Sequence, residues 1–198
     1  MTFPTTVVQS AVDVKPSRED VRALFSRGDL VPVYRTLLGD LETPVSVYLK
    51  LAQMGQTSFL LESVEGGEQV GRYSFLGVNP KGVIVVQDGV VTRTLHGQTT
   101  TYPLAPGEDP LDPIKKEFER VKPVALAGLP RFVGGAVGFV AYDFVRYVER
   151  LPQTAQNVLD VPDTAFMLID TLVIFDHAKH QVLVLANAHN TGDPDAAY

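Results

Sequence analysis

Apolar residues recur with helical spacing in three segments of the chain. The first segment follows Ser17, whose hydroxyl can cap the first turn. The second starts at Thr43, with Pro44 at its first helical position, and the third is capped by Asp109. The expected buried faces are Val21, Leu24 and Phe25; Val45, Tyr48, Leu49 and Ala52; and Ile114, Phe118 and Val121. On the third helix, we expect Lys115, Lys116, Glu117 and Glu119 to face water.

Runs of apolar and β-branched residues between these helices predict strands. The predicted strands are 31–38, 59–61, 72–77, 82–87, 90–95, 164–175 and 181–186, with further strands after His96-Gly97 and within 131–141, and a short helix that holds Tyr142, Arg146 and Tyr147. Asp88-Gly89 predicts a two-residue hairpin turn, because glycine tolerates positive φ. Segments 164–175 and 181–186 are nearly all apolar and predict one central hairpin buried on both faces. We expect an α/β (α+β) fold with mainly antiparallel sheets in a sandwich-type arrangement and flanking helices.

Composition narrows the class of protein. The 198 residues are 45% hydrophobic and 20% charged, which is ordinary for a globular domain or a large piece of one. The net charge of -6 argues against nucleic acid or anionic membrane as a partner. Cysteine is absent, so disulfides and thiolate metal sites are excluded. With neither a signal-peptide pattern nor a membrane-length apolar run, we expect a cytoplasmic location.

Two motifs invite a chemical interpretation that their context does not support. Residues 134–138 are rich in glycine, but they lack the GxGxxG order and no Lys-Ser/Thr follows, so a structural role is favoured over phosphate binding. His177 and His180 share a predicted turn with no third ligand in view, and we interpret them as exposed turn residues. No nucleophile elbow, HExxH or Walker motif is present.

One stretch places polar groups at the end of an apolar strand. Phe59, Leu60 and Leu61 are followed by Glu62 and Ser63, and then by a glycine-rich turn. Such an arrangement can hold a small polar ligand against a hydrophobic wall. The simpler interpretation is that Glu62 and Ser63 open a hairpin loop.

Four runs, at 31–51, 60–67, 71–75 and 131–152, resemble the N-terminal region of anthranilate synthase component I, a chorismate-utilising enzyme family. The resemblance covers roughly residues 30 to 187. It implies a lyase of tryptophan biosynthesis that converts chorismate and glutamine or ammonia to anthranilate and pyruvate, with L-tryptophan as allosteric feedback inhibitor. It also implies that Leu61, Glu62 and Ser63 belong to the tryptophan site.

Two alternatives stay open. One is an aminodeoxychorismate synthase component I-like region of the para-aminobenzoate branch, whose counterpart of Leu61-Glu62-Ser63 usually differs. The other is a free-standing amino-acid-binding module. The family pattern divides the chain into a loose lead-in at 1–16, the regulatory region at 17–187 and a tail at 188–198 that leads toward a C-terminal chorismate-binding part.

The resemblance places chorismate and magnesium in that C-terminal part, which we expect to lie outside this chain. We therefore expect no catalytic residue, metal site or cofactor here, and an inactive chain when it is alone. The implied partners are L-tryptophan, the C-terminal chorismate-binding part and, in the complete enzyme, a glutamine amidotransferase subunit (component II).

Overall fold

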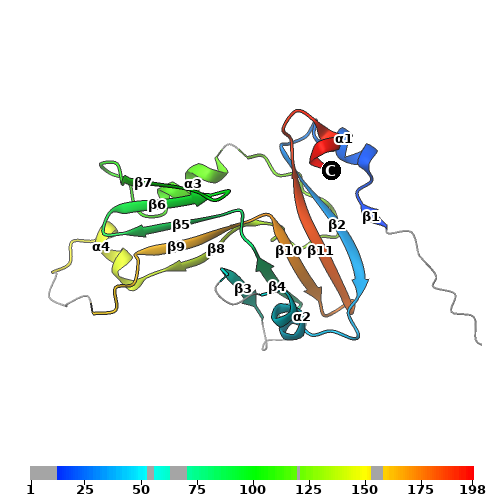
Figure 1. Cartoon of the computed structure of the whole chain (residues 1–198), viewed down its shortest axis with the longest axis horizontal. Coiled ribbons are helices and arrows are strands. Elements are labelled where there is room, and N and C mark those ends of the chain that lie inside the picture. Colours follow the sequence, from blue (N-terminus) through cyan, green and yellow to red (C-terminus); the bar gives the residue numbers. More distant parts are fainter. Residues whose placement is uncertain (1–12, 53–55, 63–70, 120, 153–157) are drawn as a thin grey trace, which may run out of the picture.

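The computed structural model describes residues 13–52, 56–62, 71–119, 121–152 and 158–198. It shows an α+β fold with two antiparallel sheets and few helices, as the sequence predicted (Figure 1). The six-stranded sheet has the order β1-β2-β11-β10-β4-β3, and the five-stranded sheet has the order β7-β6-β5-β9-β8. In Figure 1 the two sheets extend to opposite sides of the molecule from the point where β9 passes into β10.

The strands of the six-stranded sheet come from both ends of the described chain. They are β1 (Val14–Lys15), β2 (Leu30–Leu38), β3 (Ser58–Leu61), β4 (Tyr73–Val78), β10 (Thr171–Asp176) and β11 (Gln181–His189). The five-stranded sheet is built from the middle of the chain. Its strands are β5 (Gly82–Gln87), β6 (Val90–Leu95), β7 (Gln98–Pro103), β8 (Gly135–Val140) and β9 (Thr164–Ile169).

The prediction of one continuous strand over 164–175 is wrong. β9 ends at Ile169 and pairs with β5 and β8, whereas β10 begins at Thr171 and pairs with β11 and β4. The single residue between them, Asp170, carries the chain from one sheet to the other. Its carbonyl oxygen accepts hydrogen bonds from the backbone and side-chain nitrogens of Asn187, at 3.0 and 3.2 Å. These bonds compensate for the interrupted ladder.

Two helices begin where the capping residues predicted. Ser17 caps α1 (Arg18–Leu24) by accepting from the Asp20 amide at 3.2 Å. Thr43 and Ser46 form a reciprocal capping box on α2 (Pro44–Leu51). The predicted buried face of α2 is wrong in part, because Val45 and Leu49 are exposed. Instead, Val47 packs with Tyr48 against the core.

The third helix starts later than predicted. Asp109 accepts from the Leu111 amide at 2.7 Å in the turn before α3 (Asp112–Phe118), so it does not cap the helix itself. Glu117 does not face water freely, since its carboxylate binds Arg93 of β6 at 2.6 and 3.1 Å. The expected short helix is present as η1 (Tyr142–Phe144) and α4 (Val145–Val148). A last helix, α5 (Pro194–Ala197), follows β11.

Turn chemistry follows the sequence closely. Asp88 and Gly89 both have positive φ, at 50° and 73°, in the hairpin between β5 and β6. His96 and Gly97 repeat this geometry before β7. Gly138 in β8 lies so close to the Ala165 carbonyl of β9 that a Cβ could not be accommodated, which confirms that this glycine permits a close backbone approach.

The core is divided among four apolar clusters. One cluster, centred on Ile174 and Leu185, joins both sheets and includes Met167 of β9. A second covers the opposite face of β10 and contacts α2. A third lies between α3 and the five-stranded sheet around Ile84 and Leu168, and a fourth holds α1. None of the helices in the described part of the chain could span a membrane.

Candidate functional site

The end of β3 presents Leu61 at an edge of the six-stranded sheet. β3 is the last strand in the sheet order, and Leu61 pairs directly with Phe75 of β4. Directly opposed residues of antiparallel strands project from the same face and lie close together. Leu61 is 48% exposed, whereas Phe59, two residues earlier on the same face, is buried in the core. The apolar surface of β3 therefore passes from core to solvent at Leu61.

Aromatic side chains gather on the face that Leu61 shares with Phe75. The Phe75 ring meets that of Phe132 edge-to-face, with centroids 5.4 Å apart and an interplanar angle of 82°. The centroid of the Tyr73 ring lies 6.0 Å from that of the Phe75 ring. Aromatic pairs favour edge-to-face and offset contacts, and a further flat ring can add to such a group. The local surface is suited to a ligand with an aromatic body.

Charged groups flank these rings. The Arg72 guanidinium lies 4.8 Å from the Tyr73 ring centroid and binds Asp176 through two hydrogen bonds, of 3.0 and 2.8 Å. These hydrogen bonds hold the pKa of the Asp176 carboxyl below its ordinary value and raise the pKa of Arg72. Burial, with a smaller contribution from Asp176, raises the pKa of Tyr73. The Arg72 cation is thus already neutralised within the protein.

Glu62 follows Leu61 directly and is exposed. In the part of the chain that the structure describes, its carboxylate makes no hydrogen bond or ion pair, so it can accept a cationic group from a ligand. Of the three predicted site residues, the structure thus brings Leu61 to the aromatic face and places Glu62 next to it. Ser63 lies outside the described residues.

A polar pair formed by Ser74 of β4 and His177 lies on the face of the sheet opposite Phe75. The Ser74 hydroxyl and His177 Nε2 are 2.8 Å apart, the spacing of an activated nucleophile and its base. Ser74 is fully buried, however, so a substrate cannot reach it. His177 and His180 are exposed at the predicted turn between β10 and β11. Among residues with described positions, no three His, Asp or Glu side chains are grouped so that they could hold a metal ion.

Sequence reasoning missed two features near this sheet. Phe132 joins Phe75 from far along the chain, and no local pattern indicates that pairing. The cluster of Lys81, Asp170 and His189 also joins residues that are far apart in the sequence, so no local pattern predicts it. The one available signal was Asp170, a single charged residue within the apolar run 164–175.

Comparison with known proteins adds three findings. The model of a family described as chorismate binding enzyme matches residues 56–197. The chain is 40% identical over 179 residues to anthranilate synthase component 1 of Mycolicibacterium smegmatis, which covers 90% of this chain and 34% of that protein. It is 38% identical over 182 residues to the Synechocystis protein of the same name, with 91% and 35% covered.

A solved structure also resembles this one. The crystal structure of anthranilate synthase component I from Streptococcus pneumoniae aligns with a TM-score of 0.50 and 28% sequence identity. The alignment covers 79% of this chain and 32% of that one. The chain thus spans about a third of the length of the relatives it matches.

Proposed function

The chain belongs to the chorismate binding enzyme family, and we propose that it forms the tryptophan-sensing, regulatory part of an anthranilate synthase component 1. The observation that carries this proposal is the 40% identity over 90% of the chain to a protein of that name. The Synechocystis and Streptococcus pneumoniae proteins bear the same name, which supports the anthranilate branch over the para-aminobenzoate branch or a free-standing binding module.

The complete enzyme would convert chorismate and glutamine or ammonia to anthranilate and pyruvate, with magnesium, in the cytoplasm. The name "component 1" supports a second component as its partner, and we assign glutamine hydrolysis to that amidotransferase subunit. Because the chain spans about a third of its relatives' length, we assign chorismate turnover to a C-terminal part beyond it. The chain mixed with chorismate, ammonia and magnesium should form no fluorescent anthranilate; turnover above background would contradict this assignment.

We assign the tryptophan site to Leu61, Glu62 and Ser63. Leu61 would line the indole, supported by its position opposite Phe75 and beside the aromatic face. The Glu62 carboxylate, which has no partner among the described residues, would neutralise the ligand's α-ammonium. Ser63 would hydrogen-bond the polar end of the amino acid. An amino acid's cation needs such an anionic partner when it is partly removed from water.

The absence of tryptophan from the chain permits a direct binding test. At an excitation wavelength that tyrosine does not absorb, the added L-tryptophan is the only indole that fluoresces. Its fluorescence anisotropy rises on binding because it then rotates with a 21.6 kDa protein. Glu62→Gln should weaken binding by roughly tenfold to a hundredfold, because a charge-assisted hydrogen bond is lost. Glu119→Gln is the matched control, since Glu119 is exposed at the end of α3 and the net charge changes equally.

Ser63→Phe tests the same site through feedback inhibition of the complete enzyme. The substitution removes a hydroxyl and obstructs the site, so the inhibition constant for tryptophan should rise while uninhibited turnover stays close to the native rate. An unchanged inhibition constant, or a Glu62→Gln variant that binds tryptophan as the Glu119→Gln variant does, would contradict the assignment.

A further inference from the structure

A cavity of about 470 Å³ lies away from β3, beside the junction of the two sheets. The start of β2, the segment 121–135 and the residues next to Asp170 enclose it. Most of the lining is apolar and includes Leu30, Val124, Leu126, Leu129, Val133 and Leu168. Small-molecule sites typically have this volume and an apolar lining with a few converging polar groups.

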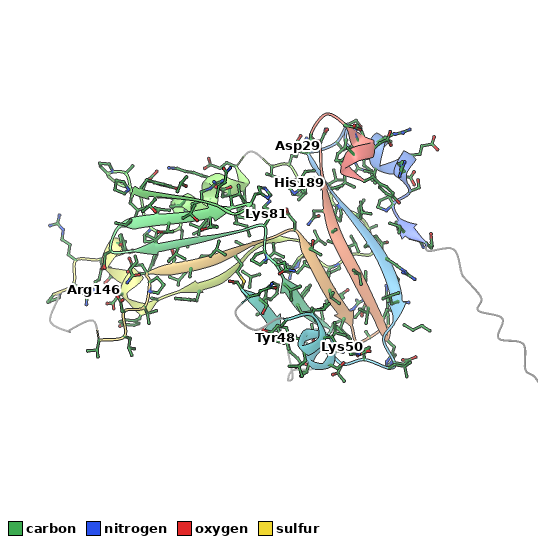
Figure 2. All side chains as sticks on the ribbon, in the orientation of Figure 1. Asp29, Tyr48, Lys50, Lys81, Arg146 and His189 are labelled. Carbon is green, nitrogen blue, oxygen red and sulfur yellow. The ribbon has the colours of Figure 1, made fainter. Side chains whose placement is uncertain are left out.

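Three polar side chains converge on one side of the cavity. Lys81 Nζ lies 3.1 Å from one oxygen of the Asp170 carboxylate, and His189 Nε2 lies 3.0 Å from the other. Lys81 precedes β5 and His189 ends β11, so the two approach from different sheets, as Figure 2 shows. All three are only partly exposed, and each side chain lines the cavity.

The walls of the cavity are held by hydrogen bonds. Asn187 Nδ2 donates to the Val133 carbonyl at 2.7 Å and to the Asp170 carbonyl, which fixes the segment 133–134 against β11. Gly134 has a φ of 150°, and a Cβ added there would lie only 2.5 Å from Asn187 Nδ2. This position in the cavity wall therefore requires glycine. Elsewhere in the lining, the Val124 amide donates to the Leu30 carbonyl at 2.8 Å. The cavity is therefore formed before any ligand arrives.

Among the charged residues that line the cavity, one cation has no partner within the described part of the chain. Glu117 lines the cavity, but both of its oxygens bind Arg93. The Asp170 carboxylate neutralises the positive charge of Lys81. Arg131 also lines the cavity, and across the described ranges it makes no hydrogen bond or ion pair. The cavity thus combines an apolar interior with one guanidinium that has no partner among the described residues, and a guanidinium is suited to binding a carboxylate.

We propose that this cavity binds a small ring-containing carboxylate, with its ring among the apolar side chains and its carboxylate at Arg131. The Lys81–Asp170–His189 cluster forms the polar wall of the cavity. An apolar part of the ligand is disfavoured on that side, because it would face these polar side chains. None of the described β3 residues lines the cavity, so this site is separate from the one assigned to tryptophan.

Indole-3-acetate is the probe for this site, because it is an aromatic monocarboxylate and the chain has no tryptophan of its own. Its anisotropy should rise to saturation at one molecule per chain. Indole-3-acetamide, the neutral analogue, should bind about tenfold more weakly, and the cation tryptamine should bind more weakly still.

Two pairs of variants locate the binding. Ala125 is an exposed residue that lines the cavity, so Ala125→Phe should obstruct the cavity and abolish binding of indole-3-acetate. Ala127, exposed on the same segment and outside the lining, gives the matched control Ala127→Phe. Arg131→Gln should remove the preference for the carboxylate over the amide, whereas Arg150→Gln, an equal charge change at another exposed position, should keep it.

The same variants separate this proposal from the tryptophan site. Ala125→Phe should leave L-tryptophan binding unchanged, and Glu62→Gln should leave indole-3-acetate binding unchanged. The proposal is overturned if indole-3-acetate shows no saturable binding to the native chain. Binding that survives Ala125→Phe, or a preference for the carboxylate that survives Arg131→Gln, also overturns it. Because Arg131 is exposed, its variant tests the proposal even if Ala125→Phe fails to fold.

Discussion

The two sheets bury their strands in different ways. In the six-stranded sheet, β10 packs on both faces, with Ile174 in the cluster that joins the sheets and Val173 in the cluster below α2. In the five-stranded sheet, β5 alternates, so that Ile84 and Val86 are fully buried while Val83 is only partly buried.

This difference follows from the coverage of each sheet. A strand covered on both faces must be apolar at every position, whereas a strand covered on one face needs apolar residues only at alternate positions. β10 has α2 on one side and the joined core on the other, while α3 covers one face of the five-stranded sheet. Neighbouring residues of β10 should therefore both contribute to stability, whereas in β5 only alternate residues should contribute strongly.

The largest expected effects come from truncations in these two strands. Ile174→Ala and Ile84→Ala should each lower the free energy of unfolding by about 2–5 kcal/mol, because both side chains are fully buried. Val173→Ala should still cost about 1–2 kcal/mol, and Val83→Ala less than about 1 kcal/mol. Chemical denaturation measures all four. Equal losses for the two valine variants would show that the sheets are covered alike.

Two strand glycines give the next comparison. Gly138→Ala in β8 places a Cβ against the backbone carbonyl of Ala165, which cannot move without separating β8 from β9. Gly77→Ala in β4 meets the Phe59 ring instead, and a side chain can turn aside. We expect Gly138→Ala to cost about 3 kcal/mol and Gly77→Ala about 1 kcal/mol, measured as unfolding free energies. The reverse order would contradict the close approach of β8 and β9.

An acid-sensitive ion pair lies at the end of the six-stranded sheet. The pKa of Asp176 is lowered chiefly by its hydrogen bonds from Arg72, and the residue is only 3% exposed. A lowered folded pKa gives stability that is complete above the unfolded pKa of about 3.9 and is lost as the pH falls through the folded value. The native chain should therefore lose this contribution progressively below about pH 4–5.

Asp176→Asn should remove that contribution and cost about 1–3 kcal/mol at neutral pH, because a buried charge-assisted pair is broken. The difference in unfolding free energy between native and variant should shrink as the pH falls toward 2–3. Asp195→Asn is the control, since its pair with Arg22 is exposed and should contribute little. A difference that stays constant with pH would contradict the assignment.

The five-stranded sheet has an alkali-sensitive counterpart and the smallest expected effect. Tyr147 donates to the Asp163 carboxylate at 2.9 Å, and burial together with this carboxylate raises the Tyr147 pKa to about 12. A raised folded pKa gives stability that is complete below the unfolded pKa of about 10 and is lost as the pH rises toward 12. Tyr147→Phe should cost about 1 kcal/mol or less at neutral pH.

Tyrosinate absorbance checks this assignment. Of the seven tyrosines, Tyr147 and Tyr73 should ionise late, since burial also raises the pKa of Tyr73. Tyr147→Phe should remove one late transition from the absorbance curve. If Tyr147→Phe leaves the late absorbance change intact, the hydrogen bond to Asp163 does not control this titration.

The features that the sequence predicted depend on neighbouring residues. Ser17 and Thr43 cap helices through amides three residues away, and Asp88-Gly89 sets its own turn geometry. Such contacts need no information from the rest of the chain. For the same reason the adjacency of Leu61 and Glu62 at the end of a strand could be foreseen.

The features that it did not predict depend on distant partners. An apolar run interrupted by a single Asp170 reads as one strand, and its division becomes evident only from Asn187, Lys81 and His189. Leu49 has the spacing of a buried residue, but the sequence does not reveal which face of α2 meets the sheet. The aromatic face beside Leu61 likewise required Phe132, which comes from another part of the chain.

The pairing of β2 with β11 sets the order in which this protein can fold during synthesis. β2 holds residues 30–38, and all nine pair with residues 181–189. While the ribosome is still producing the middle of the chain, β2 therefore cannot pair with β11, its main partner. The local hairpins β5–β6 and β6–β7 can already form at this stage. Contacts between such distant segments slow folding, and an unpaired strand is open to association with other chains. A chaperone that shields residues 30–38 until β11 emerges would therefore act at the most vulnerable stage of synthesis.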